Sequence, residues 1–370
     1  MARVKKSVHG GDVYAASREL GRKITELIDF SASINPLGPS PSVWRAITGA
    51  RHLLPHYPDP ECWDLRQALA SRWHVKPKQI LVGNGSMELI YALPRVLKID
   101  HLLLVQPTFS EYAAAMARVG GRVTTVCAGR DEQYALPIER LCGLLERPTR
   151  GFRTIKGIVL CNPNSPTGQA CEADDVMKLA RAVQRRGIWL IVDETFTDYC
   201  QERSILSLVS SWSRVVVLRS LTKFYGLPGL RVGYAVATPT VIQQLRNELP
   251  SWSVNVMGQV AALAALHDIA HAEKSLQFVL KERTRMSNAL ALLPGCTVTP
   301  TYANFIFMEL PPGWLAKRVT EQLRREGLLI RDCSSVPGAT PRSIRIAVRS
   351  RQDNDRFLKS LSRVLSESRS

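Results

Sequence analysis

The central part of the chain alternates short apolar runs with helical patterns, and this alternation constrains the fold more than any other feature. Helical patterns at residues 87–97, 111–119 and 173–186 separate several of the apolar runs. Strands that alternate with helices are typical of a mostly parallel sheet with helices on both faces. The runs that predict strands are residues 79–82, 101–105, 122–127, 155–161, 188–192, 214–218 and 232–237. The sequence therefore predicts an α/β fold around a seven-stranded sheet.

The pattern changes after residue 238, where longer helical stretches begin. Helices are predicted at 257–268, 272–293 and 314–326, with strands at 303–308 and 344–348. This mixture indicates a smaller α+β domain. We expect three parts: an N-terminal segment at 1–50 that packs with the small domain, a large domain at 51–245, and the small C-terminal domain at 246–370.

The composition excludes several classes of protein. A chain of 370 residues with 45% hydrophobic and 22% charged residues can bury a large core and is not typical of disorder. No apolar run reaches the length of about 18 residues that a membrane helix needs, and no apolar stretch of a secretory signal follows the basic N-terminus. The eight cysteines show neither CxxC pairs nor metal-ligand spacing. We therefore expect a cytoplasmic protein with reduced thiols, no membrane contact and no metal site.

The net charge of +17 is the one unusual bulk property. Such a charge can indicate nucleic-acid binding. The basic residues are spread along the chain, however, and form no zinc finger, RNP motif or basic helix. A spread positive charge also suits phosphate-bearing ligands, or only solubility. We do not expect nucleic acid as a partner.

A lysine and an aspartate follow two of the predicted strands. Lys223 comes shortly after the run 214–218, and Asp193 directly follows the run 188–192. Each alone is compatible with a solvated turn lysine or a helix cap. Together they match pyridoxal phosphate, which needs an amine for its aldehyde and a carboxylate for its ring nitrogen. The pair therefore predicts that cofactor.

The same region offers groups for the rest of the cofactor. Gly85 and Ser86 lie between a predicted strand and a helix start, where backbone N–H groups can hold a phosphate, although a plain tight turn fits equally well. Ser220, Thr222 and Arg231 can add donors, because their loops must lie near Lys223. Phe109 can stack on the ring, or serve only as core packing.

Three arginines near the C-terminus, Arg331, Arg345 and Arg349, are candidates for binding the substrate. Side chains an even number of residues apart on a strand point to the same face. Arg345 and Arg349 are therefore expected to face one side of a predicted strand. An arginine on a strand beside an active site is a natural clamp for a carboxylate. A surface strand with solvated arginines is the alternative.

These motifs, in this order, resemble fold-type I pyridoxal-phosphate enzymes of the class I/II aminotransferase group. The motifs are residues 162–168 (NPNSPTG), Asp193-Glu194, residues 220–223 (SLTK) and residues 229–234 (GLRVGY). The nearest families are threonine-phosphate decarboxylase and histidinol-phosphate aminotransferase. Segments 9–11, 29–38, 218–225, 251–255, 330–333 and 345–350 look like the decarboxylase.

The resemblance implies roles for individual residues. Lys223 would attach the cofactor aldehyde covalently, and Asp193 would pair with the pyridine nitrogen. Tyr57 would reach the cofactor phosphate of a partner subunit, which implies a homodimer. The implied cofactor-binding residues are Tyr57, Gly85, Ser86, Met87, Phe109, Asn164, Ser165, Asp193, Phe196, Ser220, Thr222, Lys223 and Arg231. The implied substrate-binding residues are His9, Gly10, Ser33, Ser165, Arg331 and Arg345, with Arg345 on the substrate carboxylate and Arg331 on its phosphate.

The chain departs from the family pattern at three positions. Ser165 and Ser33 stand where the families usually carry asparagine, and Phe196 stands where the aminotransferases usually carry tyrosine. The expected activity is decarboxylation of O-phospho-L-threonine to (R)-1-aminopropan-2-yl phosphate for cobalamin biosynthesis. Transamination of histidinol phosphate and decarboxylation of O-phosphoserine to ethanolamine phosphate stay open.

Overall fold

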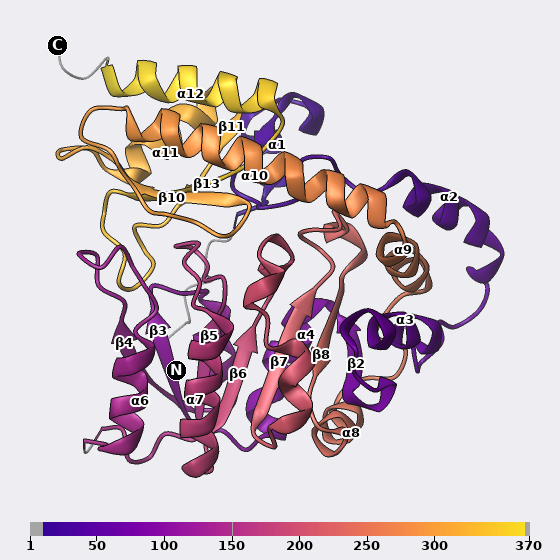
Figure 1. Cartoon of the computed structure of the whole chain (residues 1–370). Coiled ribbons are helices and arrows are strands. Elements are labelled where there is room, and N and C mark those ends of the chain that lie inside the picture. The colour runs from indigo at the N-terminus through magenta and orange to yellow at the C-terminus, as the bar shows by residue number, and fades with distance from the viewer. Residues whose placement is uncertain (1–9, 150, 367–370) are drawn as a thin grey trace.

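A seven-stranded sheet forms the centre of the molecule (Figure 1). The computed structural model describes residues 10–149 and 151–366. The strand order is β2 (Ile80–Asn84), β8 (Val232–Val236), β7 (Val215–Ser220), β6 (Trp189–Asp193), β5 (Gly157–Cys161), β3 (His101–Gln106) and β4 (Arg122–Cys127). Only β8 runs against its neighbours in this sheet. The predicted mostly parallel α/β sheet is confirmed, with each predicted run close to an observed strand.

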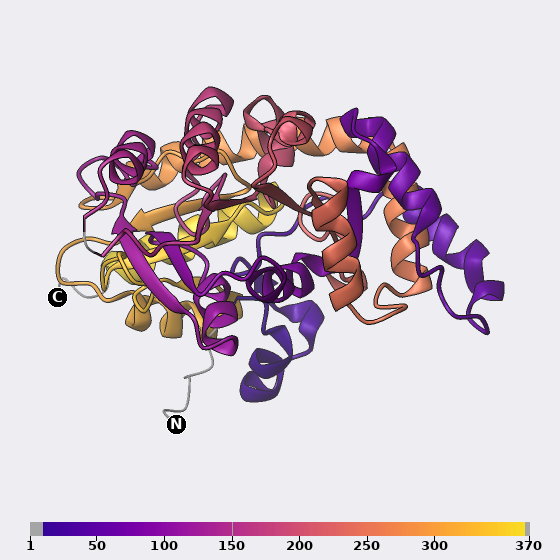
Figure 2. The same ribbon diagram turned by 90° about the horizontal axis from the view of Figure 1, so that it is seen from below.

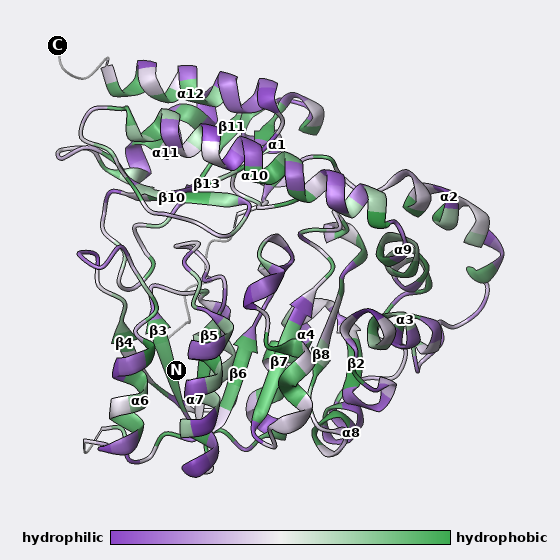
Figure 3. Cartoon of the chain, viewed as in Figure 1, coloured by the Kyte–Doolittle hydropathy of each residue, from purple (hydrophilic) through white to green (hydrophobic). Residues whose placement is uncertain are grey.

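The central strands are buried along their whole length because both faces of the sheet are covered. Every residue of β3, β5 and β7 is buried, as expected for parallel strands between helices. One core contains side chains of α4 (Gly85–Val96), α5 (Glu111–Arg118) and α8 (Pro239–Glu248). The other contains side chains of α3 (Trp63–Trp73), α6 (Ile138–Glu146), α7 (Ala173–Arg185) and α9 (Val256–His267). Figure 3 shows the apolar strands between helices with hydrophilic outer faces.

Helix α7 illustrates why these segments are helical. Its buried residues Val176, Leu179, Ala180 and Val183 recur at the spacing of one helix face. Asp174 and its neighbour Asp175 lie in the first turn, where carboxylates are favourable to the helix dipole.

A smaller antiparallel sheet lies beyond the carboxyl ends of the central strands (Figure 1). Its order is β12 (Arg331–Asp332), β13 (Ser343–Ala347), β10 (Phe305–Glu309) and β9 (Thr297–Val298). A third core joins it to α10 (Ile269–Ala291), α11 (Ala316–Arg325) and α12 (Arg351–Ser366). The predicted α+β character of this part is thus observed.

The N-terminal segment contacts two different parts of the molecule. Strand β1 (Ile28–Asp29) pairs in parallel with β11 (Leu328–Leu329), and α1 (Val13–Leu20) precedes it. Helix α2 (Pro41–Gly49) instead packs on α9, at the side of the molecule away from the smaller sheet (Figure 2). The three-part division at residues 50 and 245 stays a prediction. Within the described residues, no helix combines the length and the apolar character needed to span a bilayer.

Candidate active site

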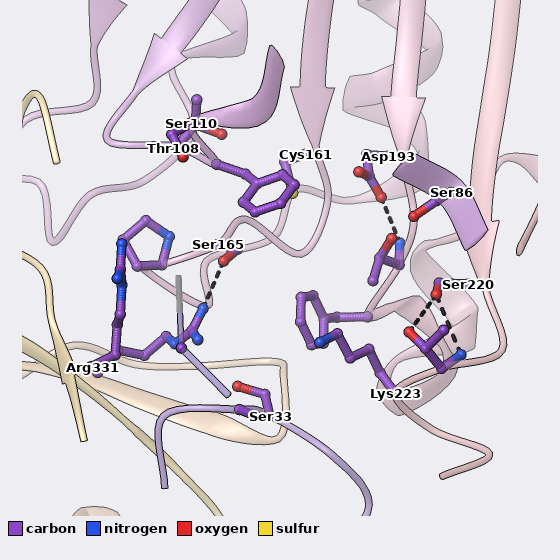
Figure 4. A pocket seen from close by; sticks show the side chains of 18 of the residues that line it. Ser33, Ser86, Thr108, Ser110, Cys161, Ser165, Asp193, Ser220, Lys223 and Arg331 are labelled. Atoms are coloured by element: carbon purple, nitrogen blue, oxygen red, sulfur yellow. Dashed lines mark hydrogen bonds between the residues drawn. The ribbon is translucent and has the colours of Figure 1, made fainter. Parts of the chain in front are cut away.

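The carboxyl ends of three neighbouring strands form one wall of a cavity of about 350 Å³. Cys161 ends β5, Asp193 ends β6 and Ser220 ends β7. Arg331 and Arg345 of the smaller sheet also line the cavity. Figure 4 shows Arg331 on the far side of the cavity from Asp193 and Ser220. Ligands of open α/β sheets bind at this edge.

Lys223 lies in the loop that follows β7 and lines the cavity (Figure 4). Burial lowers the pKa of Lys223 to about 8, and the positive charges of Arg345 and Arg231 act in the same direction, while Asp29 opposes them. A large share of the amine is therefore neutral, and so nucleophilic, near pH 8.

The loop that carries Lys223 is held against the N-terminal segment. The carbonyl oxygen of Lys223 accepts the N–H of Asn35 at 3.0 Å. Gly226 has a φ of 69°, and a Cβ there would lie 2.7 Å from the carbonyl carbon of Gly38. Glycine is therefore required for this close approach of two backbones.

Asp193 is almost fully buried, with 3% of its surface exposed. Its Oδ1 accepts the N–H of Thr195 at 2.9 Å, and its Oδ2 accepts the hydroxyl of Tyr112 at 2.7 Å. Burial raises the pKa of Asp193, and these two hydrogen bonds oppose the rise. A carboxylate held in this way suits a cationic ring nitrogen, which would balance its charge.

A cradle for an anion lies where α4 begins. No side chain caps the helix at Asn84, so the first N–H groups of α4 remain suitable donors. Gly85 has a φ of 76°, and a Cβ there would lie 2.7 Å from Nη2 of Arg231. Ser86, Ser220, Thr222 and Arg231 line the cavity. Hydroxyls, amides and a guanidinium are the groups that bind phosphate.

Three aromatic side chains, Phe109, Tyr112 and Phe196, line the cavity and are fixed by edge-to-face contacts. Phe109 meets Tyr112 at 5.7 Å between ring centroids, and Phe196 meets Phe305 at 5.0 Å. Met87 lines the same cavity. An amine of lowered pKa, a buried carboxylate, an anion cradle and aromatic walls together fit pyridoxal phosphate.

Arg345 reaches from β13 into the cavity. Its Nη1 donates to Ser165 Oγ at 2.9 Å and its Nη2 donates to the carbonyl oxygen of Ser31 at 2.8 Å. The guanidinium also lies 5.0 Å from the ring centre of Phe305. Burial lowers the pKa of Arg345, although arginine stays charged in any ordinary pH range. Arg331 is its neighbour across the β12–β13 ladder.

Ser33 presents a buried hydroxyl to the same cavity. The side chain is 1% exposed, and its Oγ has no hydrogen-bond partner within the described part of the chain. The Nε of Arg345 is also buried, and it too has no hydrogen-bond partner among the described residues. Buried polar atoms without partners are rare in proteins, so both groups are suited to a polar ligand.

The cavity contains most, but not all, of the predicted site residues. Gly10, Ser33, Ser86, Met87, Phe109, Ser165, Asp193, Phe196, Ser220, Thr222, Lys223, Arg231, Arg331 and Arg345 line it. Gly85 does not line the cavity, although it is the first residue of α4 and lies against Arg231. Asn164 is outside: its amide nitrogen donates to the Pro107 carbonyl at 2.9 Å and to Thr167 at 2.8 Å. His9 lies outside the described residues.

Two further residues lie away from the cavity. Tyr57 is 81% exposed and stacks on Trp252 at 4.8 Å. Arg349 was expected to face the same side of the strand as Arg345. That prediction was wrong, because β13 ends at Ala347, and Arg349 instead forms an ion pair with Asp353, with 3.8 Å between Nε and Oδ2.

Sequence reasoning missed other residues that line the cavity. They are Ser31, Ala32, Thr108, Ser110, Tyr112, Cys161, Pro166, Thr195, Cys333 and Val336. Several of them are next in sequence to a predicted site residue just after a strand end. Their position near a strand end could therefore have identified them as lining residues. Tyr112 lies three residues after Phe109 on α5, and only the fold brings it to Asp193.

The chain is similar to known proteins over nearly its whole length. Residues 25–361 match the family described as aminotransferase class I and II. The threonine-phosphate decarboxylase of Salmonella typhimurium is 34% identical over 361 residues, which cover 97% of each chain. A histidinol-phosphate aminotransferase of Anaeromyxobacter is 34% identical over 363 residues, covering 97% of this chain and 96% of that protein.

A solved structure extends this similarity to the fold. The histidinol-phosphate aminotransferase of Sinorhizobium meliloti, in complex with pyridoxal-5′-phosphate, superposes with a TM-score of 0.86 at 25% identity. The match covers 99% of this chain and 98% of that one.

Proposed function

The chain belongs to the aminotransferase class I and II family, whose members use pyridoxal 5′-phosphate, and on that basis we propose that it decarboxylates O-phospho-L-threonine. The proposed products are CO₂ and (R)-1-aminopropan-2-yl phosphate, for cobalamin biosynthesis. Lys223 and Asp193 are the proposed catalytic residues.

The observation that carries this proposal is the pair of arginines in one cavity with Lys223. Arg331 and Arg345 both line it, so it suits a substrate with two anionic groups. O-phospho-L-threonine has a phosphate and a carboxylate, whereas histidinol phosphate has only the phosphate. The similarity to the Salmonella decarboxylase supports the same substrate.

The proposed mechanism assigns one task to each residue. When bound, the cofactor's pyridinium ring draws electron density from the substrate carbon that bears the amine. Asp193 holds the proton on the ring nitrogen, where burial strengthens the ion pair. Arg345 holds the substrate carboxylate, and Arg331 binds the phosphate at the other end. The carboxyl group would leave as CO₂, and Lys223 in its ammonium form, or a bound water, would deliver the proton that replaces it at Cα.

Two features of the cavity suit this chemistry. Phe109 and Phe196 exclude water from the reacting carbon, which preserves the charge interactions of Asp193 and Lys223. Phe196 also lacks the hydroxyl that the aminotransferases usually carry at this position. The resemblance to the decarboxylase tolerates phenylalanine at this position.

Transamination of histidinol phosphate is the second candidate. The similarity to the Anaeromyxobacter aminotransferase favours it at the same 34% identity, and the carboxylates of its 2-oxo acid partner would also use Arg345. The test supplies the cofactor-loaded protein with O-phospho-L-threonine, O-phosphoserine, or histidinol phosphate with 2-oxoglutarate. Release of CO₂ from phosphothreonine is expected. Formation of glutamate without CO₂ would favour the aminotransferase instead.

We also propose that the enzyme acts as a homodimer in which Tyr57 completes the partner's site. Exposed apolar side chains support this: Trp252, which stacks on Tyr57, is 50% exposed, and Leu54 and Trp63, which lie close to Tyr57 in the sequence, are 62% and 58% exposed. Large exposed apolar patches mark interfaces. Mixing inactive Tyr57→Ala and Lys223→Ala subunits is expected to restore activity, because one site of each mixed dimer is then intact. No gain on mixing, with mixed dimers demonstrated, would refute the shared site.

A further inference from the structure

Ser31 stands where three distant segments of the chain meet. Its side chain is buried, with 5% exposed, and lines the cavity. Its Oγ accepts the N–H of Gly11 at 2.8 Å. Its carbonyl oxygen accepts Nη2 of Arg345 at 2.8 Å. One residue therefore contacts both the N-terminal turn and the arginine of β13.

Asp29 fixes the orientation of the Ser31 hydroxyl. The Oδ1 of Asp29 accepts the Ser31 hydroxyl at 2.5 Å and the Ser31 N–H at 2.8 Å. The hydroxyl proton is thus committed to the carboxylate, and a lone pair of Oγ is directed at Gly11. A hydroxyl that donates to a carboxylate becomes a stronger acceptor. The bond to Gly11 is therefore strengthened by Asp29.

The N-terminal turn lies directly against the same residue. A Cβ at Gly10 would overlap the carbonyl oxygen of Ser31, so only glycine allows the two backbones to approach this closely. That carbonyl is the one that accepts Arg345. Gly10, Ser31, Arg331 and Arg345 all line the cavity.

From these contacts we propose that Ser31 is a positioning residue that ties the Gly10–Gly11 turn to Arg345. It thereby fixes the distance between the phosphate-binding and the carboxylate-binding ends of the cavity. The inference rests on the proposed function only in that the ligand carries a phosphate, which holds for phosphothreonine and for histidinol phosphate alike. Ser31 itself acts through its neighbours and not on the reacting atoms.

The variant Ser31→Ala separates the two contacts. It removes the hydroxyl's bonds to Gly11 and to Asp29 but keeps the backbone bonds of residue 31 to Arg345 and Asp29. Gly11 is exposed, so water can replace the lost partner and the fold is preserved. The dissociation constant for O-phospho-L-threonine is expected to rise about fivefold to tenfold, the scale of one hydrogen bond. That for L-threonine is expected to stay unchanged, and kcat at saturation to change less than about twofold.

Ser17→Ala is the matched control, because it loosens the other end of the same segment. The hydroxyl of Ser17 donates to the carbonyl oxygen of Arg22 at 2.6 Å, just past the end of α1, and the structure gives Ser17 no bond to Ser31. The affinity ratio between phosphothreonine and threonine is expected to stay at its wild-type value. A fall in that ratio as large as in Ser31→Ala would assign the effect to the helix and not to Ser31.

Both variants are measured in the cofactor-loaded protein, by titrating its visible absorbance with phosphothreonine, threonine, histidinol phosphate and histidinol. A selective loss for the phosphorylated member of either pair supports the inference. An equal loss for both members overturns it. Preference for a phosphorylated ligand without CO₂ release would refute the proposed decarboxylation. The role of Ser31 would still be decided by how Ser31→Ala changes the affinity ratio between the phosphorylated and the unphosphorylated ligand. A wild-type protein that prefers neither phosphorylated ligand refutes both.

Discussion

The cofactor end and the substrate end of the cavity are built in different ways. At the cofactor end, Asp193 and Ser220 are the last residues of adjacent strands, so the ladder of the sheet fixes their spacing. At the substrate end, a ladder also pairs Arg331 with Arg345, but Ser31 lies 314 residues from Arg345 in the chain and contacts it through one hydrogen bond. The first end is built within one sheet, whereas the second also depends on a contact between distant segments. Changes at the first should abolish chemistry, and changes at the second should alter selection of the substrate.

The largest effect is expected for Lys223→Ala. Loss of the amine removes both the covalent attachment of the cofactor and the proton donor at the substrate carbon, so kcat should fall by about 10⁴-fold or more. Borohydride should no longer fix the cofactor to the protein. Lys178→Ala is the control, because Lys178 pairs with Glu139 and Asp175 on the surface. Retained attachment together with retained turnover would refute the assigned role of Lys223.

Asp193→Asn should lower kcat by about 10²- to 10³-fold, the scale of removing one preorganised charge interaction. The amide cannot balance a cationic ring nitrogen, but the phosphate cradle is untouched, so affinity for the cofactor should change much less than kcat. Tyr112→Phe is the matched variant: it removes one hydrogen bond from the same carboxylate and keeps the charge. Because the charge stays, the loss should be smaller than for Asp193→Asn, about 10- to 100-fold. Equal losses in the two variants would show that orientation matters and charge does not.

Arg345→Met tests the substrate end. Removing hydrogen bonds to a charged group costs about 1.5–3 kcal/mol each, so KM for phosphothreonine should rise about 10- to 100-fold. The absorbance of the bound cofactor should stay unchanged. Arg349→Met is the control, because Arg349 pairs with Asp353 outside the cavity. A changed cofactor spectrum with an unaffected KM would show that Arg345 acts at the cofactor end and not at the substrate end.

The cofactor end could be predicted from the sequence because its signals are local. Buried parallel strands have continuous apolar runs, so their carboxyl ends, and with them Asp193 and Lys223, can be read from the sequence. The antiparallel direction of β8 was not predicted, because a buried strand has the same pattern in either direction. Helices α1, α2, α3, α6, α8 and α12 were also missed. The sequence of α3 shows no clear apolar face, whereas that of α12 is amphipathic and could have been recognised.

The substrate end could be predicted only in part, because its contacts join distant segments. Arg331 and Arg345 were predicted as candidates from their place near a C-terminal strand, the resemblance assigned their roles, and both line the cavity. Nothing in the sequence around Ser31 indicates that it accepts hydrogen bonds from residues 11 and 345. Asn164 followed the family motif, yet its side chain binds Pro107 and Thr167. A motif fixes the order of residues, whereas the direction of a side chain depends on its neighbours in space.

The smallest effect expected is a shift in pH dependence that connects the two ends. The pKa of Lys223 is lowered to about 8, first by burial and then by Arg345 and Arg231. Only the neutral amine attacks an aldehyde, so the rate of cofactor uptake by the cofactor-free protein should rise with pH and level off above about 8. Arg345→Met removes a positive charge, which favours the protonated amine and should move this midpoint to higher pH.

The measurement is the appearance of the cofactor's bound absorbance at a series of pH values, for wild type and for Arg345→Met. Arg349→Met should keep the wild-type midpoint, because Arg349 is not among the charges that act on Lys223. A wild-type midpoint near the ordinary lysine value of about 10.4 would contradict the burial of Lys223. A midpoint unmoved in Arg345→Met would show that the arginine of the substrate end does not act on the amine of the cofactor end. In that case the two ends are electrostatically independent.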